Sequence, residues 1–265
     1  MLTGGEPTLR ADLEDITARL GALPGLRDLG ITSNGIVLAK KLPALRAAGL
    51  TAVNISLDSL VPAKFELLTR RQGHDRVLAS IDAALALGYA PVKLNCVIMR
   101  GVNDDELLDF VALTKDRNIN VRFIEYMPFD GNAWAAQKMV PYAEMRGVVV
   151  QAHPGMARLD DLPDEVAKNF RLPGHVGSVS FITSMSSHFC AGCSRLRLLA
   201  DGALKVCLFA TAETSLRDPL RAGADDAALA EVVGAAVARK KLAHDGVPTA
   251  QLVRKSNRAM IRIGG

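Results

Sequence analysis

The chain has 265 residues, of which 49% are hydrophobic and 23% are charged, so it can bury a large core as one barrel-sized α/β domain or two smaller ones. A formal net charge of +4 is too small for a nucleic-acid-binding protein, which needs a clustered basic stripe. No apolar run is long enough to span a membrane. Four cysteines form no disulfide framework, so we expect a reducing, intracellular compartment.

The first half of the sequence alternates short β-branched runs with amphipathic helical patterns, which is typical of βα units on a parallel sheet. We expect helices at residues 12–23, 38–48, 75–87 and 104–115, and strands at 26–32, 51–57, 92–99 and 120–126. No G-x-G-x-x-G opens a helix, so residues 1–130 are predicted to form a partial TIM-like barrel rather than a Rossmann domain. The sequence opens at Thr3-Gly4-Gly5-Glu6-Pro7 without the strand that should precede this turn, and we therefore expect the first βα unit to be missing.

Residues 131–265 are predicted to form a second region, a C-terminal β/α extension of the α/β fold. We expect a helix at 142–149, a connecting segment at 153–174, antiparallel strands at 178–183, 196–200 and 204–209, and helices at 215–221 and 225–241. Arg239, Lys240 and Lys241 are interpreted as a cap for the dipole of the last helix. The final Gly264-Gly265 is either an arm that enters a crowded cavity or a conjugation tail, and the second interpretation needs a β-grasp domain that this sequence does not suggest.

Three of the four cysteines form a C-x2-C-x13-C pattern made of Cys190, Cys193 and Cys207. A hairpin turned at Asp201-Gly202 can bring the third thiol back toward the first two. A metal site is the leading hypothesis. A zinc site needs a fourth ligand, for which His188 is an awkward candidate, whereas an iron–sulfur cluster with three thiolates keeps one iron open. The alternative is a reduced hairpin whose cysteines are only small apolar residues.

Two arginines follow the cysteine pair at alternate positions. On a strand, Arg195 and Arg197 project to the same side. Forked guanidinium groups beside an open metal position predict an anionic substrate, most plausibly a phosphate.

Polar residues recur at every second position in the expected strands, as in Asn54-Ile55-Ser56-Leu57-Asp58 and Lys93-Leu94-Asn95. Strands buried on both faces should be nearly continuous apolar runs, so this pattern predicts one polar face that looks into the barrel and holds a ligand. Half-exposed strands of an antiparallel sheet are the alternative. Lys93 and Arg122 need either buried carboxylates, which Glu125 or Asp58 could supply, or a bound phosphate. Cys96 lies among apolar neighbours and is expected to be a core residue.

Taken together, these motifs resemble the GTP 3′,8-cyclase family of radical S-adenosylmethionine enzymes, over nearly the whole chain and closest to its eukaryotic branch. The resemblance rests on the following segments: Thr3–Pro7 (TGGEP), Thr32–Gly35 (TSNG), Asn54–Asp58 (NISLD), Pro91–Met99 (PVKLNCVIM), Arg100–Asp104 (RGVND), Arg122–Pro128 (RFIEYMP), Phe189–Arg197 with Cys207, and Gly264-Gly265.

The resemblance implies a lyase that converts GTP to (8S)-3′,8-cyclo-7,8-dihydroguanosine 5′-triphosphate in molybdenum cofactor biosynthesis. Family members carry two [4Fe–4S] clusters. One, on a C-x3-C-x2-C loop, cleaves S-adenosylmethionine to a radical. The other, matched here by Cys190, Cys193 and Cys207, binds the guanine of GTP.

The resemblance also implies residue roles and partners. Contacts with S-adenosylmethionine are expected for Gly5, Ser56 and Met127, and contacts with GTP for Thr32, Lys93, Arg195 and Arg197, with Arg122 in the same pocket and Lys93 and Arg122 as the catalytic candidates. The Gly-Gly tail is expected to reach the active site. The family further suggests a homodimer, a functional partnership with cyclic pyranopterin monophosphate synthase, and the mitochondrial matrix if the source is eukaryotic or the cytoplasm if it is not.

Three departures from the family pattern qualify this expectation. No cysteine precedes Cys96, Met1 stands where the family has a GTP-contacting arginine, and Ser194 replaces the usual asparagine. We therefore expect the chain to be inactive by itself, either because an upstream segment is missing from the sequence or because it is a natural short form. The alternative functions are a non-catalytic iron–sulfur module that binds GTP and a structural zinc protein.

Overall fold

A seven-stranded sheet in the order β1-β2-β3-β4-β7-β6-β5 is the centre of the fold. The computed structural model describes residues 1–130, 132, 134–162, 165–241, 243–246, 251–252 and 258–263. Strands β1 to β4 and β7 run parallel, and β6 and β5 are antiparallel at one edge. The strands are β1 (Gly30–Ser33), β2 (Ala52–Ser56), β3 (Val92–Ile98), β4 (Ile119–Glu125), β5 (Ala157–Arg158), β6 (Lys168–Arg171) and β7 (Ser178–Ile182).

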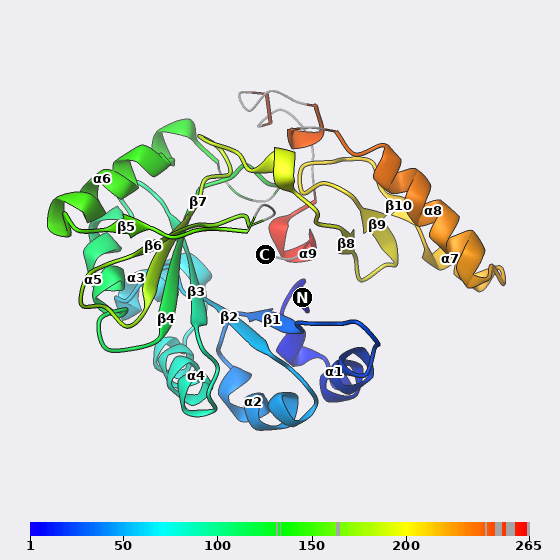
Figure 1. The fold of residues 1–265 in the computed structure, drawn as a ribbon, viewed down its shortest axis with the longest axis horizontal. Coiled ribbons are helices and arrows are strands. Elements are labelled where there is room, and N and C mark those ends of the chain that lie inside the picture. Colours follow the sequence, from blue (N-terminus) through cyan, green and yellow to red (C-terminus); the bar gives the residue numbers. More distant parts are fainter. Residues whose placement is uncertain are drawn as a thin grey trace.

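Helices cover the outer side of this curved sheet (Figure 1). They are α1 (Leu13–Gly21), α2 (Leu38–Ala47), α3 (Pro62–Thr69), α4 (His74–Ala86), α5 (Leu107–Ala112) and α6 (Tyr142–Ala152). Burial along β3 alternates strictly, with Val92, Leu94, Cys96 and Ile98 fully buried against the helices. The apolar core therefore lies between sheet and helices, and the other face of each strand is left for polar residues. No helix in the described part of the chain is long and apolar enough to cross a membrane.

The expected α/β fold with parallel βα units is confirmed, and most of its predicted elements are present within a few residues. Helix α3 was not predicted, because only Phe65 in it is buried and Leu67 is 77% exposed, which leaves no apolar periodicity to detect. The helix expected at 104–115 is a 3₁₀ turn, Asp104–Glu106, followed by the shorter α5. Leu2 forms a parallel bridge to Ile31, so the Thr3–Pro7 turn does follow a strand-like residue.

The antiparallel arrangement predicted for residues 178–183 is confirmed on one side of the strand and wrong on the other. Strand β7 pairs in parallel with β4, from Asn120↔Ser178 to Ile124↔Ile182, and antiparallel only with β6. Strands β5 and β6 form a hairpin within the segment that was expected to be a connection. Residue alternation gives the faces of a strand but not the direction of its neighbours, which explains both errors. The division of the chain into two regions at residue 130 stays a prediction. The large sheet contains strands from before this residue, β1 to β4, and from after it, β5 to β7.

A second, three-stranded sheet follows in the order β10-β9-β8 and forms a lobe with α7 and α8 (Figure 1). Its elements are β8 (Arg197–Leu198), β9 (Ala203–Lys205), β10 (Thr214–Ser215), α7 (Arg217–Arg221) and α8 (Asp226–Ala238), and a short helix α9 (Met260–Ile263) comes later in the chain. The expected hairpin at Asp201-Gly202 is present, with Arg197 opposite Lys205. Gly202 has a φ of 80°, a left-handed conformation that glycine adopts without strain. Gly264 and Gly265 lie outside the described residues.

Gly177 and Gly147 provide a matched pair for testing this packing. A Cβ atom at Gly177, just before β7, would lie 2.2 Å from the Ile119 carbonyl oxygen, whereas one at Gly147 in α6 would meet nothing within 4 Å. We expect Gly177→Ala to lower the free energy of unfolding by about 2 kcal/mol or more, because backbone must move. Gly147→Ala should raise it by roughly 0.5–1 kcal/mol through helix propensity. Urea denaturation checks both, and equal midpoints for the two variants would contradict the placement of β7.

Candidate active site

Two rows of polar side chains cross the inner face of the large sheet, the first near the amino ends of β3, β4 and β7 and the second near the middle of the same strands. Parallel register aligns their members from strand to strand, so each row shares one face and one height. The first row is Thr32, Asn54, Lys93, Asn120 and Ser178, and the second is Ser56, Asn95, Arg122 and Ser180. The polar face expected from the period-two pattern is therefore formed by five parallel strands, and its binding of a ligand stays a prediction.

Several amides in these rows have hydrogen-bonding capacity left over. Asn54 donates to Thr32 Oγ1 at 3.3 Å, but its Oδ1 is buried without a partner in the described part of the chain, and the same holds for Asn95 Oδ1. Asn120, by contrast, is satisfied by Ser178 Oγ at 2.7 Å and Ser180 Oγ at 2.6 Å. Buried polar atoms are nearly always hydrogen-bonded in folded proteins. The orphaned oxygens lie on Asn54 and Asn95, the row neighbours of Lys93 and Arg122, and indicate a site that accepts a hydrogen-bonding ligand.

Four cations gather at the same face. Burial lowers the pKa of Lys93 most, and repulsion from Arg122 lowers it further. Glu165 and Asp28 raise it, and Arg195 has the smallest effect and lowers it. Burial likewise lowers the pKa of Arg122 and of Arg197, with Arg195 acting on both in the same direction. Positive groups that repel one another in a desolvated place are stabilised by an anion. Arg195 itself is exposed, so this cluster is open to solvent on one side.

The carboxylates that were expected to pair with Lys93 and Arg122 are engaged elsewhere. Glu125 accepts hydrogen bonds from the backbone N–H groups of Tyr142, Met185 and Ser186. Asp58 accepts one from the Val97 N–H at 2.8 Å. Neither Lys93 nor Arg122 forms an ion pair among the described residues, although Glu165 acts electrostatically on both. The bound phosphate stays a prediction for these two cations.

The Thr3–Pro7 turn is fixed to the next strand end by one side chain. Glu6 accepts hydrogen bonds from Ser33 Oγ at 2.7 Å and from the Asn34 N–H at 2.7 Å. Gly4 and Gly5 have positive φ angles of 89° and 52°, and Gly5 is exposed. The turn therefore presents bare backbone at the edge of the sheet, where a ligand can approach closely.

The cysteine motif lies on a 3₁₀ turn, Cys190–Gly192, and on the segment after β9 that contains Cys207. Cys193 and Cys207 both act on the pKa of the Arg197 guanidinium, so the two arms of the hairpin meet around this arginine. Lys240 Nζ lies 3.6 Å from Cys193 Sγ and donates to the Cys193 and Arg195 carbonyls at 2.5 and 3.1 Å. Two cations, Arg197 and Lys240, therefore lie beside the cysteine motif. Lys240 was expected only to cap a helix.

The three cysteines of the motif, Cys190, Cys193 and Cys207, are free thiols at partly exposed positions. Within the described ranges, no three histidine, cysteine or acidic side chains stand together as a site for one metal ion. Three thiolates can hold an iron–sulfur cluster and leave one iron open, and this assignment stays a prediction for the motif.

A small apolar cluster joins the strand ends to the cysteine motif. Met185, Phe209 and Leu252 are buried together, and Met127 and Cys207 pack against them. Phe129 stacks on Phe209 with ring centroids 5.8 Å apart. Met127 lies two residues after the end of β4. The resemblance assigned Met127 to S-adenosylmethionine and Cys207 to the iron–sulfur cluster, and both residues pack in this one apolar cluster.

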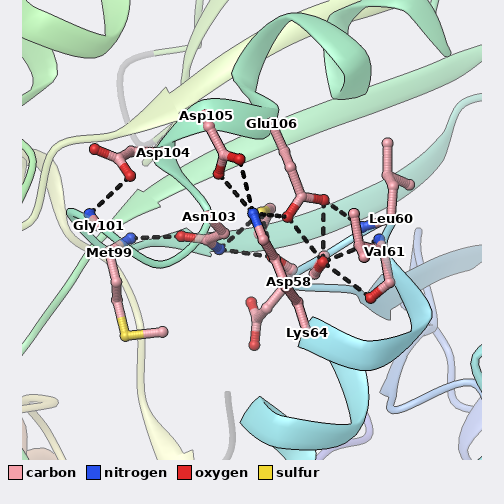
Figure 2. A network of polar contacts seen from close by, with 12 residues as sticks. Asp58, Leu60, Val61, Lys64, Met99, Gly101, Asn103, Asp104, Asp105 and Glu106 are labelled. Atoms are coloured by element: carbon pink, nitrogen blue, oxygen red, sulfur yellow. Dashed lines mark hydrogen bonds and ion pairs between the residues drawn. The ribbon is translucent and has the colours of Figure 1, made fainter.

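A polar network ties the loops after β2 and β3 together (Figure 2). Asn103, fully buried, donates to the Asp58 and Val97 carbonyls at 2.6 and 2.9 Å and accepts from the Met99 N–H at 2.8 Å. Glu106 accepts from Ser59 Oγ at 2.9 Å and from the Leu60 N–H at 2.6 Å. This network fixes the loop that begins two residues after Ser56. Asn103 belongs to the RGVND motif, Arg100–Asp104, to which the sequence alone assigned no role.

Comparison with known proteins adds two family matches. Residues 1–114 match the Radical SAM superfamily, and residues 119–246 match the family Molybdenum Cofactor Synthesis C.

Curated relatives are similar over essentially the whole chain. Identity is 65% to "GTP 3′,8-cyclase, mitochondrial" of Arabidopsis thaliana, over 100% of this chain and 67% of that protein. It is 56% to "Molybdenum cofactor biosynthesis protein 1" of Homo sapiens, over 99% and 41%, and 44% to "GTP 3′,8-cyclase" of Moorella thermoacetica, over 100% and 80%. The chain thus spans about two fifths of the human relative and about two thirds of the plant relative.

The Asp58 carboxyl provides a pH-dependent test of the loop network. Burial raises its pKa to about 6 from an ordinary 3.8, so stability present below pH 4 is lost as the pH rises through 6. Asp58→Asn, which keeps an acceptor for Val97, should be more stable than the unaltered chain at pH 7 by up to roughly 3 kcal/mol, with no gain at pH 4.

Thermal unfolding between pH 4 and 7 measures this difference. Asp105→Asn is the control, because a hydrogen bond from Lys64 lowers the pKa of Asp105 and its contribution is lost only as the pH falls below that range. A pH profile unchanged by Asp58→Asn would contradict the assignment.

Proposed function

Since the chain belongs to the GTP 3′,8-cyclase family of radical S-adenosylmethionine enzymes, we propose that it binds GTP across the polar face of the large sheet. Membership of the family implies a [4Fe–4S] cluster, S-adenosylmethionine and GTP. The observation that carries the proposal is the gathering of Lys93, Arg122, Arg195 and Arg197 without ion-pair partners among the described residues, beside orphaned amide oxygens.

The cations bind the triphosphate in this proposal. Arg122 and Arg197 offer forked donors to phosphate oxygens, and Lys93 adds a point charge whose lowered pKa a bound anion would raise again. Thr32 and the amide oxygen of Asn54 are close enough to share a hydrogen-bonding ligand with the same row. Lys93 and Arg122 orient the substrate and neutralise the negative charge of its phosphates, and this is their catalytic contribution.

S-adenosylmethionine is assigned to the neighbouring strand ends. Gly5 offers backbone, Ser56 a hydroxyl in the second row, and Met127 an apolar contact next to the cluster that contains Cys207. Cys190, Cys193 and Cys207 would hold a [4Fe–4S] cluster with one iron open to the guanine. S-adenosylmethionine supplies the radical chemistry when it is cleaved, and the residues of this chain bind, orient and shield the reactants.

The conversion of GTP to (8S)-3′,8-cyclo-7,8-dihydroguanosine 5′-triphosphate is proposed for the protein with a radical-generating cluster. That cluster needs a C-x3-C-x2-C loop, and no cysteine precedes Cys96 in the 265-residue sequence. The second candidate is therefore an iron–sulfur module that binds GTP without turnover. A cyclisation assay of the chain with and without an added cysteine loop separates the two, since turnover only with the loop favours the enzyme.

We also propose a mitochondrial matrix location, because the Arabidopsis relative is described as mitochondrial. A homodimer and a functional partnership with cyclic pyranopterin monophosphate synthase are further proposals that follow from the family.

Lys93→Met tests the triphosphate site. Removing the cation should weaken GTP binding by about tenfold or more, because a charge-assisted contact to phosphate is worth roughly 1.5–3 kcal/mol. Anaerobic titration calorimetry gives the dissociation constant. Lys115→Met, at an exposed position outside the two rows, is the control and should bind as the unaltered chain does. Equal affinities for GTP and guanosine in the unaltered chain would overturn the assignment.

Serine replacement of Cys190, Cys193 and Cys207 tests the cluster. After anaerobic reconstitution the unaltered chain should carry one [4Fe–4S] cluster, and the triple variant should carry none. Cys96→Ala is the matched control, because Cys96 is fully buried in the apolar core and should leave the iron content unchanged. A colourless unaltered chain that retains zinc would contradict the proposal.

A further inference from the structure

Glu125 is a buried carboxylate that neither the substrate nor the cluster assignment uses. It is the last residue of β4, three positions after Arg122 and two before Met127, and its exposed fraction is 0%. Its side chain lies on the helix-facing side of the strand, opposite the face of Arg122. An ionised group in such a place persists only where hydrogen bonds replace its hydration.

Most of those hydrogen bonds lead to one turn, residues 183–187, which follows β7. The Met185 and Ser186 N–H groups donate to Glu125 Oε2 at 2.7 and 2.8 Å, and the Ser186 hydroxyl donates to Oε1. The Tyr142 N–H, at the start of α6, also donates to Glu125, at 2.8 Å. Glu125 thus takes the place of a side-chain cap for α6, because the N-cap residue Pro141 has no side-chain donor or acceptor. Capping α6 therefore accounts for one of the four contacts, and the turn accounts for three.

Lys168 holds the same turn from the other side. Its Nζ donates to Thr183 Oγ1 at 2.9 Å and to Ser187 Oγ at 2.8 Å, and it lies 4.8 Å from the Tyr142 ring centroid. The turn is thus fixed between an anion from β4 and a cation from β6. Burial lowers the pKa of Lys168, and Glu125 acts against that shift.

The turn leads directly into the cysteine motif. Only His188 and Phe189 separate Ser187 from Cys190. Met185, whose N–H is bound by Glu125, packs in the apolar cluster that contains Cys207 and Met127. Glu125 therefore connects the strand that carries Arg122 to the turn from which the first cysteine arm begins.

We propose that Glu125 is a positioning residue which, together with Lys168, holds the turn 183–187 so that the Cys190 arm faces the substrate pocket. This inference rests on the proposed function. Glu125 touches neither substrate nor cluster and acts through the turn, as residues behind metal ligands commonly do.

The experiment compares Glu125→Gln with a matched control, Glu106→Gln. Glu106 is 2% exposed and also accepts from a serine hydroxyl and a backbone N–H, but on the loops after β2 and β3. After anaerobic reconstitution, iron released to a chelator is followed by absorbance. Glu125→Gln should lose iron about 10-fold faster than the unaltered chain, because changing a residue that supports metal ligands typically costs about 10–100-fold in metal affinity. Glu106→Gln should release iron within about twofold of the unaltered rate.

Two further measurements keep the test independent of global folding. Lys168→Met removes the other anchor at a partly exposed position and should accelerate iron release in the same direction. In metal-free protein, hydrogen exchange at the Met185 and Ser186 amides should be faster in Glu125→Gln and unchanged in Glu106→Gln.

The outcomes separate the inference from the proposed function. Unaltered iron release in both Glu125→Gln and Lys168→Met overturns the inference and leaves the cluster assignment standing. Equal acceleration in Glu106→Gln also overturns it, because the effect would then be general destabilisation. If the unaltered chain holds no more iron than the triple serine variant, the proposed function fails and the inference fails with it.

Discussion

The structure places positive charge at buried positions of the sheet without an ion pair among the described residues. Lys93 and Arg122 lie on the inner face of the sheet, and their lowered pKa values have burial as their largest cause. Arg195, from the segment that leads into the cysteine hairpin, adds repulsion on Lys93, Arg122 and Arg197. Desolvated like charges destabilise a fold unless an anion is bound, so the arrangement is better explained by a ligand than by packing. The orphaned oxygens of Asn54 and Asn95 point to the same conclusion from hydrogen bonding.

Three glutamates bind backbone groups of loops rather than the cations of the pocket. Glu6, Glu106 and Glu125 each accept backbone N–H groups from a loop beyond the end of a strand. Each carboxylate is thereby satisfied without neutralising a cation of the pocket. This division holds the loops in place and leaves the pocket positive, and both properties suit the proposed binding of a triphosphate.

The two halves of the site come from distant parts of the sequence. The rows of polar residues belong to the parallel sheet, and the thiols belong to a small lobe with its own antiparallel hairpin. The apolar cluster of Met127, Met185 and Cys207 and the turn anchored by Glu125 connect them. Strand β7 is central to this connection, because its parallel pairing with β4 delivers the turn to the carboxyl edge of the sheet.

The sequence alone determined the βα alternation, the polar face of β2 and β3, the hairpin at Gly202 and the cysteine pattern, because each is a local periodicity or spacing. Only the tertiary structure decided that β7 is parallel, that Glu125 and Asp58 bind backbone instead of Lys93 and Arg122, and that Lys240 reaches Cys193. The partner of a strand depends on residues far apart in the chain. So does the group, cation or backbone N–H, to which a buried carboxylate binds. No pattern within one segment of sequence contains that information.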